Sequence, residues 1–196
     1  MEIQYKASLN GAAFLLFELK QVVKLKQKSM SSEEIRRKVL EENVFQGGKK
    51  SSMSRALTSV IRRAEVIDQT IGEKLLEGSL ETSKAINLYS IMKTDLLFYE
   101  FMSEVICDKL HNDILLLEKK DINLFFTVKI EQSELVAQWS EVTIKKLKRA
   151  YLQVLFESGI LKERQGTELN RLVIDEQLKE HLKYIGDAKY VHAMGE

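Results

Sequence analysis

The chain has 196 residues, of which 44% are hydrophobic and 30% are charged, a composition that excludes a disordered or fibrous protein. It contains no proline to interrupt long helices, and its single cysteine cannot form an internal disulfide. The longest uncharged run, residues 7–17, has 11 residues, whereas a membrane-spanning helix needs about 20. These features predict a mostly helical, soluble, cytoplasmic protein with one or two domains.

The net charge is only +1, but it is unevenly distributed along the chain. Residues 45–65, the first basic segment, carry five Lys or Arg against one acid. Residues 66–139 carry seven against thirteen, and residues 140–171, the second basic segment, carry seven against four. Because phosphate contacts are local, the two basic segments are candidate nucleic-acid-binding regions despite the near-neutral total.

The first third of the chain predicts three helices. Apolar residues at helical spacing predict the first over residues 9–28. Ser31 lies three residues before Glu34, the spacing of a capping box, and predicts the start of the second. The glycines at 47–48 interrupt the pattern, which restarts with a 3.6-residue period over residues 51–71.

The middle of the chain predicts two further amphipathic helices within residues 79–120 and few loops. A change of pattern near residues 111–120 predicts a domain boundary. We therefore expect an N-terminal helical domain with a possible helix-turn-helix over residues 1–115. A winged helix-turn-helix domain is expected over residues 116–196.

The last third predicts three helices followed by a short β-hairpin and a closing helix. The three helices are expected over residues 121–130, 133–138 and 140–158, and Gly159 is expected to end the last one. The segments "ILKER" and "LNRLVI", separated by "QGTE", are typical of a short β-hairpin. "DEQLKEHLKYIG" then predicts the closing helix. Three helices followed by a hairpin is the order of a winged helix-turn-helix, so the expected fold class is all-α with this C-terminal element.

The helix expected over residues 140–158 is basic only in its first half. An apolar stripe of five residues must pack, whereas the cations occupy the opposite arc. A recognition helix divides its length in this way, because its N-terminal part reads the major groove and its C-terminal part is core. A solvated lysine-rich surface on an ordinary helix is the alternative. The stripe is Ile144, Leu147, Tyr151, Val154 and Leu155, and the DNA-contacting candidates are Lys145, Lys146, Lys148 and Arg149, with Lys162, Arg164 and Arg171 on the wing.

The first basic segment has a similar construction. Hydroxyls and guanidiniums recur on one face, and such groups at a helix start suit phosphate oxygens. The turn before this helix is longer than that of an ordinary helix-turn-helix, and a simple polar face explains the pattern equally well. The DNA-contacting candidates here are Lys49, Lys50, Ser52, Arg55, Ser59, Arg62 and Arg63.

No enzyme signature is found in the sequence. His111, His181 and His192 are isolated, with no partner at a metal-ligand spacing, and one cysteine excludes the common zinc motifs. Neither a phosphate-binding glycine motif nor a nucleophile elbow occurs. We therefore expect a non-catalytic protein without a metal or cofactor.

Four segments carry a resemblance to a known family: "YKASLNGAAFLLFEL", "LEENVFQ", "SSMSRALTSVIRR" and "TIKKLKRAYLQVLFESGIL". Over nearly its whole length the chain resembles BrxA, a small component of bacterial BREX phage-defence systems. The resemblance implies an all-helical protein with helix-turn-helix elements that binds double-stranded DNA. It also implies a DNA methyltransferase, a phosphatase-like protein and a large ATPase as partners in the same system.

The residues and the resemblance together predict a double-stranded DNA-binding accessory protein. One alternative is a protein–protein adaptor, for which the acidic middle and the Leu- and Phe-rich helices would supply the surface. A transcriptional regulator is another, and it would require a dimer symmetry that the sequence does not display. The oligomeric state and the preferred DNA sequence stay open.

Overall fold

The computed structural model describes residues 4–47, 49–164 and 167–196. These residues form helices and the segments that connect them and contain no regular strand, so the fold is all-α. Residues 4–15, here called the N-terminal segment, precede the first helix. The helices are α1 (Leu16–Lys26), α2 (Ser32–Glu41), α3 (Lys50–Glu65), α4 (Gln69–Glu77), α5 (Leu80–Thr94), α6 (Leu96–Phe101), the π-helix η1 (Met102–Cys107), α7 (Asp108–His111), α8 (Lys119–Gln132), α9 (Glu134–Ala137), α10 (Glu141–Ser158), α11 (Glu176–Tyr184) and α12 (Ala188–Ala193).

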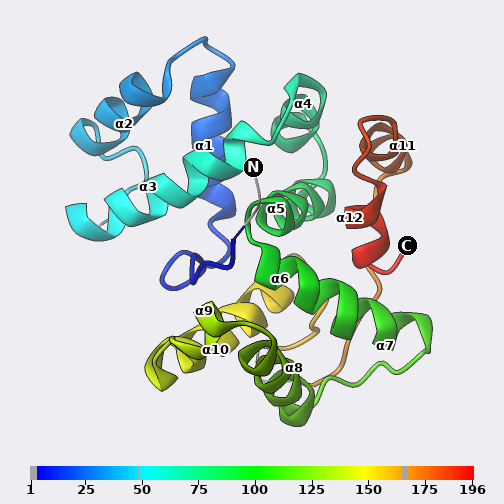
Figure 1. Cartoon of the computed structure of the whole chain (residues 1–196). Coiled ribbons are helices and arrows are strands. Elements are labelled where there is room, and N and C mark those ends of the chain that lie inside the picture. Colours follow the sequence, from blue (N-terminus) through cyan, green and yellow to red (C-terminus); the bar gives the residue numbers. More distant parts are fainter. Residues whose placement is uncertain (1–3, 48, 165–166) are drawn as a thin grey trace.

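Helix α5 lies at the centre of the molecule. Residues 85–92 are all buried, which is the pattern of a helix surrounded by others. It packs against α3, α4, α6, α10 and α12, so helices from both ends of the chain meet on it (Figure 1). A continuous apolar core consequently includes residues from Leu9 to Met194. The domain boundary expected between residues 115 and 116 falls in the loop between α7 and α8, and it stays a prediction.

The first helix begins later than the prediction over residues 9–28 places it. Gly11 and Leu15 have positive φ angles of 78° and 55°, a left-handed conformation that a continuous right-handed helix does not permit. The carbonyl groups of residues 12–14 accept hydrogen bonds from the buried Arg63 guanidinium instead of from a helical turn. The N-terminal segment is therefore held by tertiary contacts, although its composition favours helix.

Helices α2 and α3 follow the prediction with one difference. The capping box is confirmed: the Ser31 side chain accepts from the Glu34 N–H, and the Glu34 side chain accepts from the Ser31 N–H. The helix predicted over residues 51–71 is divided, because Asp68 caps a new helix by accepting from the Ile71 N–H at 2.8 Å. The chain consequently bends between α3 and α4.

Helices α8, α9 and α10 confirm the three helices predicted in the last third. Gly159 ends α10 with a φ of 93°, a conformation that favours glycine. All five residues of the predicted apolar stripe are buried, and the aromatic ring of Tyr151 lies 4.9 Å from that of Phe98, centroid to centroid. The apolar face of α10 is therefore the one that the sequence predicts.

The predicted β-hairpin is wrong as regular secondary structure. In the described part of the chain, the two segments are joined by an isolated bridge between Leu161 and Leu169. The pairing stays short because the second segment is shared: Leu169 N–H donates to the Leu115 carbonyl at 3.0 Å, and a separate bridge links Leu116 to Glu168. The turn residues 165–166 lie outside the described residues.

The closing helix α11 is confirmed, and a further short helix, α12, follows it. Leu178 and Leu182 are buried as expected, but 37% of Ile185 is exposed because it lies just beyond the end of α11.

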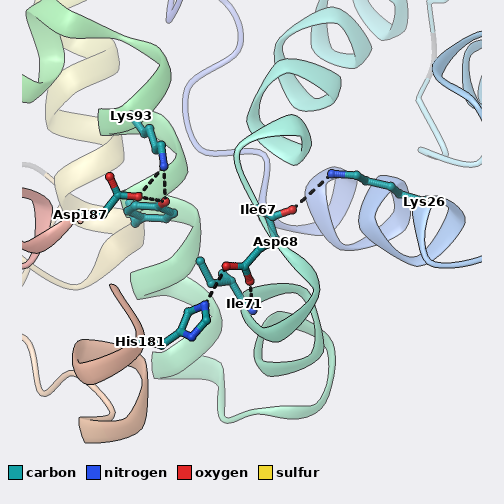
Figure 2. Close-up of polar contacts among 8 residues, drawn as sticks. Lys26, Ile67, Asp68, Ile71, Lys93, His181 and Asp187 are labelled. Carbon is teal, nitrogen blue, oxygen red and sulfur yellow. Dashed lines mark hydrogen bonds and ion pairs between the residues drawn. The ribbon is translucent and has the colours of Figure 1, made fainter. Parts of the chain in front are cut away.

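Polar contacts join these helices to the core (Figure 2). On α5, Lys93 forms an ion pair with Asp187, which also accepts from the Tyr89 hydroxyl at 2.6 Å.

A second polar contact ties α11 to the start of α4. His181 Nε2 lies 2.7 Å from Asp68 Oδ2 (Figure 2). Partial burial by itself raises the pKa of Asp68, but hydrogen bonds from the Ile71 N–H and His181 outweigh it and hold that pKa below its ordinary value. The charged carboxylate therefore serves as both helix cap and tie.

Within the described ranges, no helix combines the length and the apolar character required to cross a bilayer.

Candidate nucleic-acid interface

The short helix α9 and the long helix α10 follow each other in the order that a helix-turn-helix predicts. Residues 138–140 connect them, a turn of the length that this motif uses. The Ser140 side chain caps α10 by accepting from the Thr143 N–H at 3.2 Å. Because the apolar stripe holds α10 against the core, the opposite arc of its first half faces solvent.

Three cations on this arc are exposed. Lys145, Lys146 and Arg149 form no ion pair with any residue that the structure describes. A cluster of unneutralised cations on one helix face attracts phosphate. These three residues, here called the α10 cluster, are therefore well placed for the role that the sequence predicts.

Lys148 is turned away from this cluster. Its Nζ donates to Asn123 Oδ1 at 2.7 Å and lies 5.5 Å from the centroid of the Phe126 ring, both on α8. Burial lowers its pKa below the ordinary value for lysine. Lys148 therefore serves the α8–α10 contact, and its role in DNA contact stays a prediction.

Two of the three cations predicted on the wing are also engaged within the protein. Lys162 forms an ion pair with Glu168 across the isolated bridge. Arg171 donates to the Leu110 carbonyl and, at 2.6 Å, to Asp113 Oδ1. Arg164 is exposed. The wing consequently has less free positive charge than its composition predicts.

In the first basic segment, as in α10, the start of the helix is exposed and its second half is buried. Lys49, Lys50, Ser52 and Arg55, here called the α3 cluster, are exposed at the start of α3. No side chain among the described residues caps this end of the helix, so its N–H groups are open to an anion. The predicted surface face does not continue along the second half of α3.

The second half of α3 is covered by α1 and the N-terminal segment. Arg63 is only 1% exposed and donates to three backbone carbonyls at 2.7–2.8 Å. Ser59 is 9% exposed, and Arg62 is partly covered, with its Nε buried. The prediction that Ser59 and Arg63 contact DNA is therefore wrong, because the helical period could not reveal that the N-terminal segment covers this face.

The N-terminal segment lies between α3 and α10. Arg63 holds it to α3, and on its other side it borders a cleft of about 660 Å³ that Lys146 and Arg149 also line. In Figure 1 the N-terminal ends of α3 and α10 lie on the same, left-hand side of the molecule. The two clusters are thus presented from neighbouring parts of one fold.

A different group of side chains meets at the far end of the molecule, where the sequence predicts only isolated histidines. Cys107 Sγ lies 3.2 Å from His111 Nδ1, and the two residues have the i, i+4 spacing of one helical face. His192, on α12, brings a third potential ligand atom, and all three atoms lie within 4.8 Å of one another. The i, i+4 spacing was a signal for the first pair, whereas no local pattern points to His192.

Comparison with known proteins identifies the family. A family model described as BrxA matches residues 3–186. The chain belongs to the BrxA family. A curated relative, "BREX protein BrxA" from Bacillus cereus (strain H3081.97), is 38% identical over 188 residues, which is 95% of this chain and 94% of the relative.

A solved structure shares the fold. An uncharacterized protein from Magnetospirillum magneticum superposes with a TM-score of 0.83 over 97% of both chains, at 19% sequence identity. At this identity the match concerns the fold alone. The resemblance to the BrxA family that the sequence indicates is thus confirmed over almost the whole chain.

Proposed function

We propose that this member of the BrxA family is a non-catalytic accessory protein of a bacterial BREX phage-defence system that binds double-stranded DNA. The first half of α10 would enter the major groove, and the α3 cluster would contact neighbouring phosphates. The partners are DNA and other proteins of the system, such as its methyltransferase, phosphatase-like protein and ATPase.

The observation that carries this proposal is the α10 cluster. Lys145, Lys146 and Arg149 are exposed on the first half of a helix whose second half is core, whereas Lys148, Lys162 and Arg171 are engaged within the protein. Cations that have no partner in the described part of the chain can release counterions from a duplex at little internal cost. The three-residue turn before α10 gives further support, because its length is that of a helix-turn-helix.

The same arrangement favours weak sequence preference. Lysines outnumber asparagine and glutamine in the exposed half of α10, and lysine contacts phosphate more readily than it distinguishes bases. If about six phosphates are neutralised, log K against log salt should have a slope of about −5. A single high-affinity operator would instead favour a transcriptional regulator.

The first prediction tests the α10 cluster by a triple substitution, Lys145→Gln, Lys146→Gln and Arg149→Gln. Affinity for a fluorescent duplex, measured by anisotropy at several salt concentrations, should fall, and the log–log slope should decrease by about three units. The fold should be kept, because the three side chains lie on the exposed arc. Circular dichroism checks this point.

A charge-matched control separates local contacts from net charge. The triple variant Lys24→Gln, Lys28→Gln and Lys183→Gln removes the same charge from exposed positions outside both clusters. It should bind almost as the parent does. If the α10 variant binds as tightly as this control, the proposed interface is wrong.

An adaptor role is the second candidate, and one feature favours it. Residues 114–116 are an isoleucine and two leucines, and 48%, 40% and 46% of their surfaces are exposed. Adjacent exposed apolar residues are typical of protein contacts. A parent protein that shows no DNA binding even at low salt would make this reading the better one.

A further inference from the structure

The cluster of Cys107, His111 and His192 joins two distant parts of the chain. Cys107 ends η1, His111 ends α7 and His192 lies on α12, 85 residues beyond Cys107. The Cys107 thiol donates to the His192 carbonyl at 3.2 Å, and the two imidazole rings are 4.9 Å apart, centroid to centroid. In the metal-free chain this contact places α12 so that both rings lie beside the sulfur, and a bound ion would replace it, because a thiolate has no proton to donate.

The donor set is one that borderline-soft metal ions prefer. A thiolate and two imidazoles are common ligands of Zn²⁺, in sites that leave a fourth position for water. In a tetrahedral zinc site, bond lengths of about 2.0–2.3 Å place neighbouring ligand atoms about 3.3–3.6 Å apart. The 3.2 Å separation of Sγ from Nδ1 is close to this value, and all three ligand atoms lie within 4.8 Å of one another; to bind an ion, His111 Nδ1 would give up its 2.9 Å contact with the Cys107 carbonyl.

The three proposed ligands differ in their exposure to solvent. Cys107 is buried, whereas His111 and His192 are exposed, so an ion can enter from solvent and contact the sulfur from the outer side. Cys107 is also the last residue of a π-helical turn, a distortion that occurs often at functional sites. None of the three proposed ligands belongs to the α10 cluster.

We propose that Cys107, His111 and His192 form a zinc site that fastens α12 to the end of α7, with water as the fourth ligand. The site would hold the C-terminal helices in place in addition to the ion pair of Lys93 with Asp187. It is independent of DNA binding, so either proposal can fail without the other.

The second prediction tests this site with protein that carries no affinity tag and has been stripped with a chelator. Titration with Zn²⁺ in a calorimeter should give one equivalent, and Co²⁺ should give a thiolate-to-cobalt charge-transfer band in the near ultraviolet. Loss of an outer-shell partner costs about 10–100-fold in metal affinity, so loss of a ligand in His192→Gln should cost at least about tenfold. His181→Gln, which alters a histidine outside the cluster, should bind as the parent does.

Thermal melts supply a second readout. Zn²⁺ should raise the melting temperature of the parent and of His181→Gln but not that of His192→Gln, because binding to the folded state alone stabilises it. Since His192 is exposed, its substitution should not unfold the chain. Absence of the charge-transfer band in the parent, or equal Zn²⁺ affinity in the two histidine variants, would overturn the proposal.

Discussion

Arg63 stabilises a part of the fold that lacks regular secondary structure. Its guanidinium is buried and donates to the carbonyls of Ala12, Ala13 and Phe14. Burial lowers the pKa of Arg63 to about 9, which still leaves it charged at neutral pH. A charged donor shared by three backbone acceptors thus fixes the N-terminal segment against α3.

The third prediction concerns this residue. Arg63→Gln should lower the free energy of unfolding by roughly 3–5 kcal/mol, because the buried carbonyls of Ala12 and Ala13 lose the Arg63 donor, whereas Asn87 still donates to that of Phe14. Arg55→Gln, on the exposed half of the same helix, should change it by no more than about 0.5 kcal/mol. Urea denaturation measures both. Equal effects would mean that the three hydrogen bonds contribute nothing to stability.

At the scale of the helices, the features that the sequence predicts correctly are those that depend only on residues nearby in the chain. The capping box at Ser31 and the apolar stripe of α10 are local signals, and both are confirmed. The N-terminal segment could not be predicted, because its conformation depends on Arg63, about 50 positions away. Asp68 is a different case, since an aspartate before a helical stretch is itself a local capping signal, so the start of α4 is predictable from the sequence.

In the candidate sites, too, local features are predictable from the sequence and contacts between distant residues are not. Exposure of the α10 cluster could be predicted from the helical period, whereas the engagement of Lys148 with Asn123 on α8 required the tertiary structure. The proposed zinc site has a local part and a distant part, because Cys107 and His111 are close in sequence but His192 is not.

The fourth prediction tests the two faces of α10. Leu147 is fully buried, so Leu147→Ala should cost about 2–5 kcal/mol, whereas Lys145→Ala should cost little. Thermal melts compare the variants directly. Similar shifts in melting temperature would mean that the faces of this helix are assigned wrongly.

For the whole molecule, the main question is whether the α3 and α10 clusters act together. Both helices start on the same side of the fold, with the N-terminal segment between them (Figure 1). A surface of this kind can hold one duplex at two places, and the benefit of a second contact depends on a duplex long enough to reach it.

The fifth prediction separates a clamp from a single site. If both clusters hold the duplex, Lys49→Gln, Lys50→Gln and Arg55→Gln together should weaken binding to long duplexes about as much as the α10 triple variant does, and should reduce the advantage of long duplexes over short ones. If α3 only supports the complex, the loss should be smaller at every length. Binding isotherms on duplexes of graded length measure the difference, and an α3 variant that binds like the parent at all lengths would restrict the interface to α10.

The contacts of the N-terminal segment also limit when this segment can reach its final position during synthesis on the ribosome. Tyr5 donates to Glu100 and Ser8 to Asp95, and the segment borders α10, which is synthesised much later. Tyr5 and Ser8 therefore reach their final contacts only after the chain has been synthesised past Glu100. Until then, the segment is held by its contacts with elements that are made earlier, such as the hydrogen bonds from Arg63 on α3.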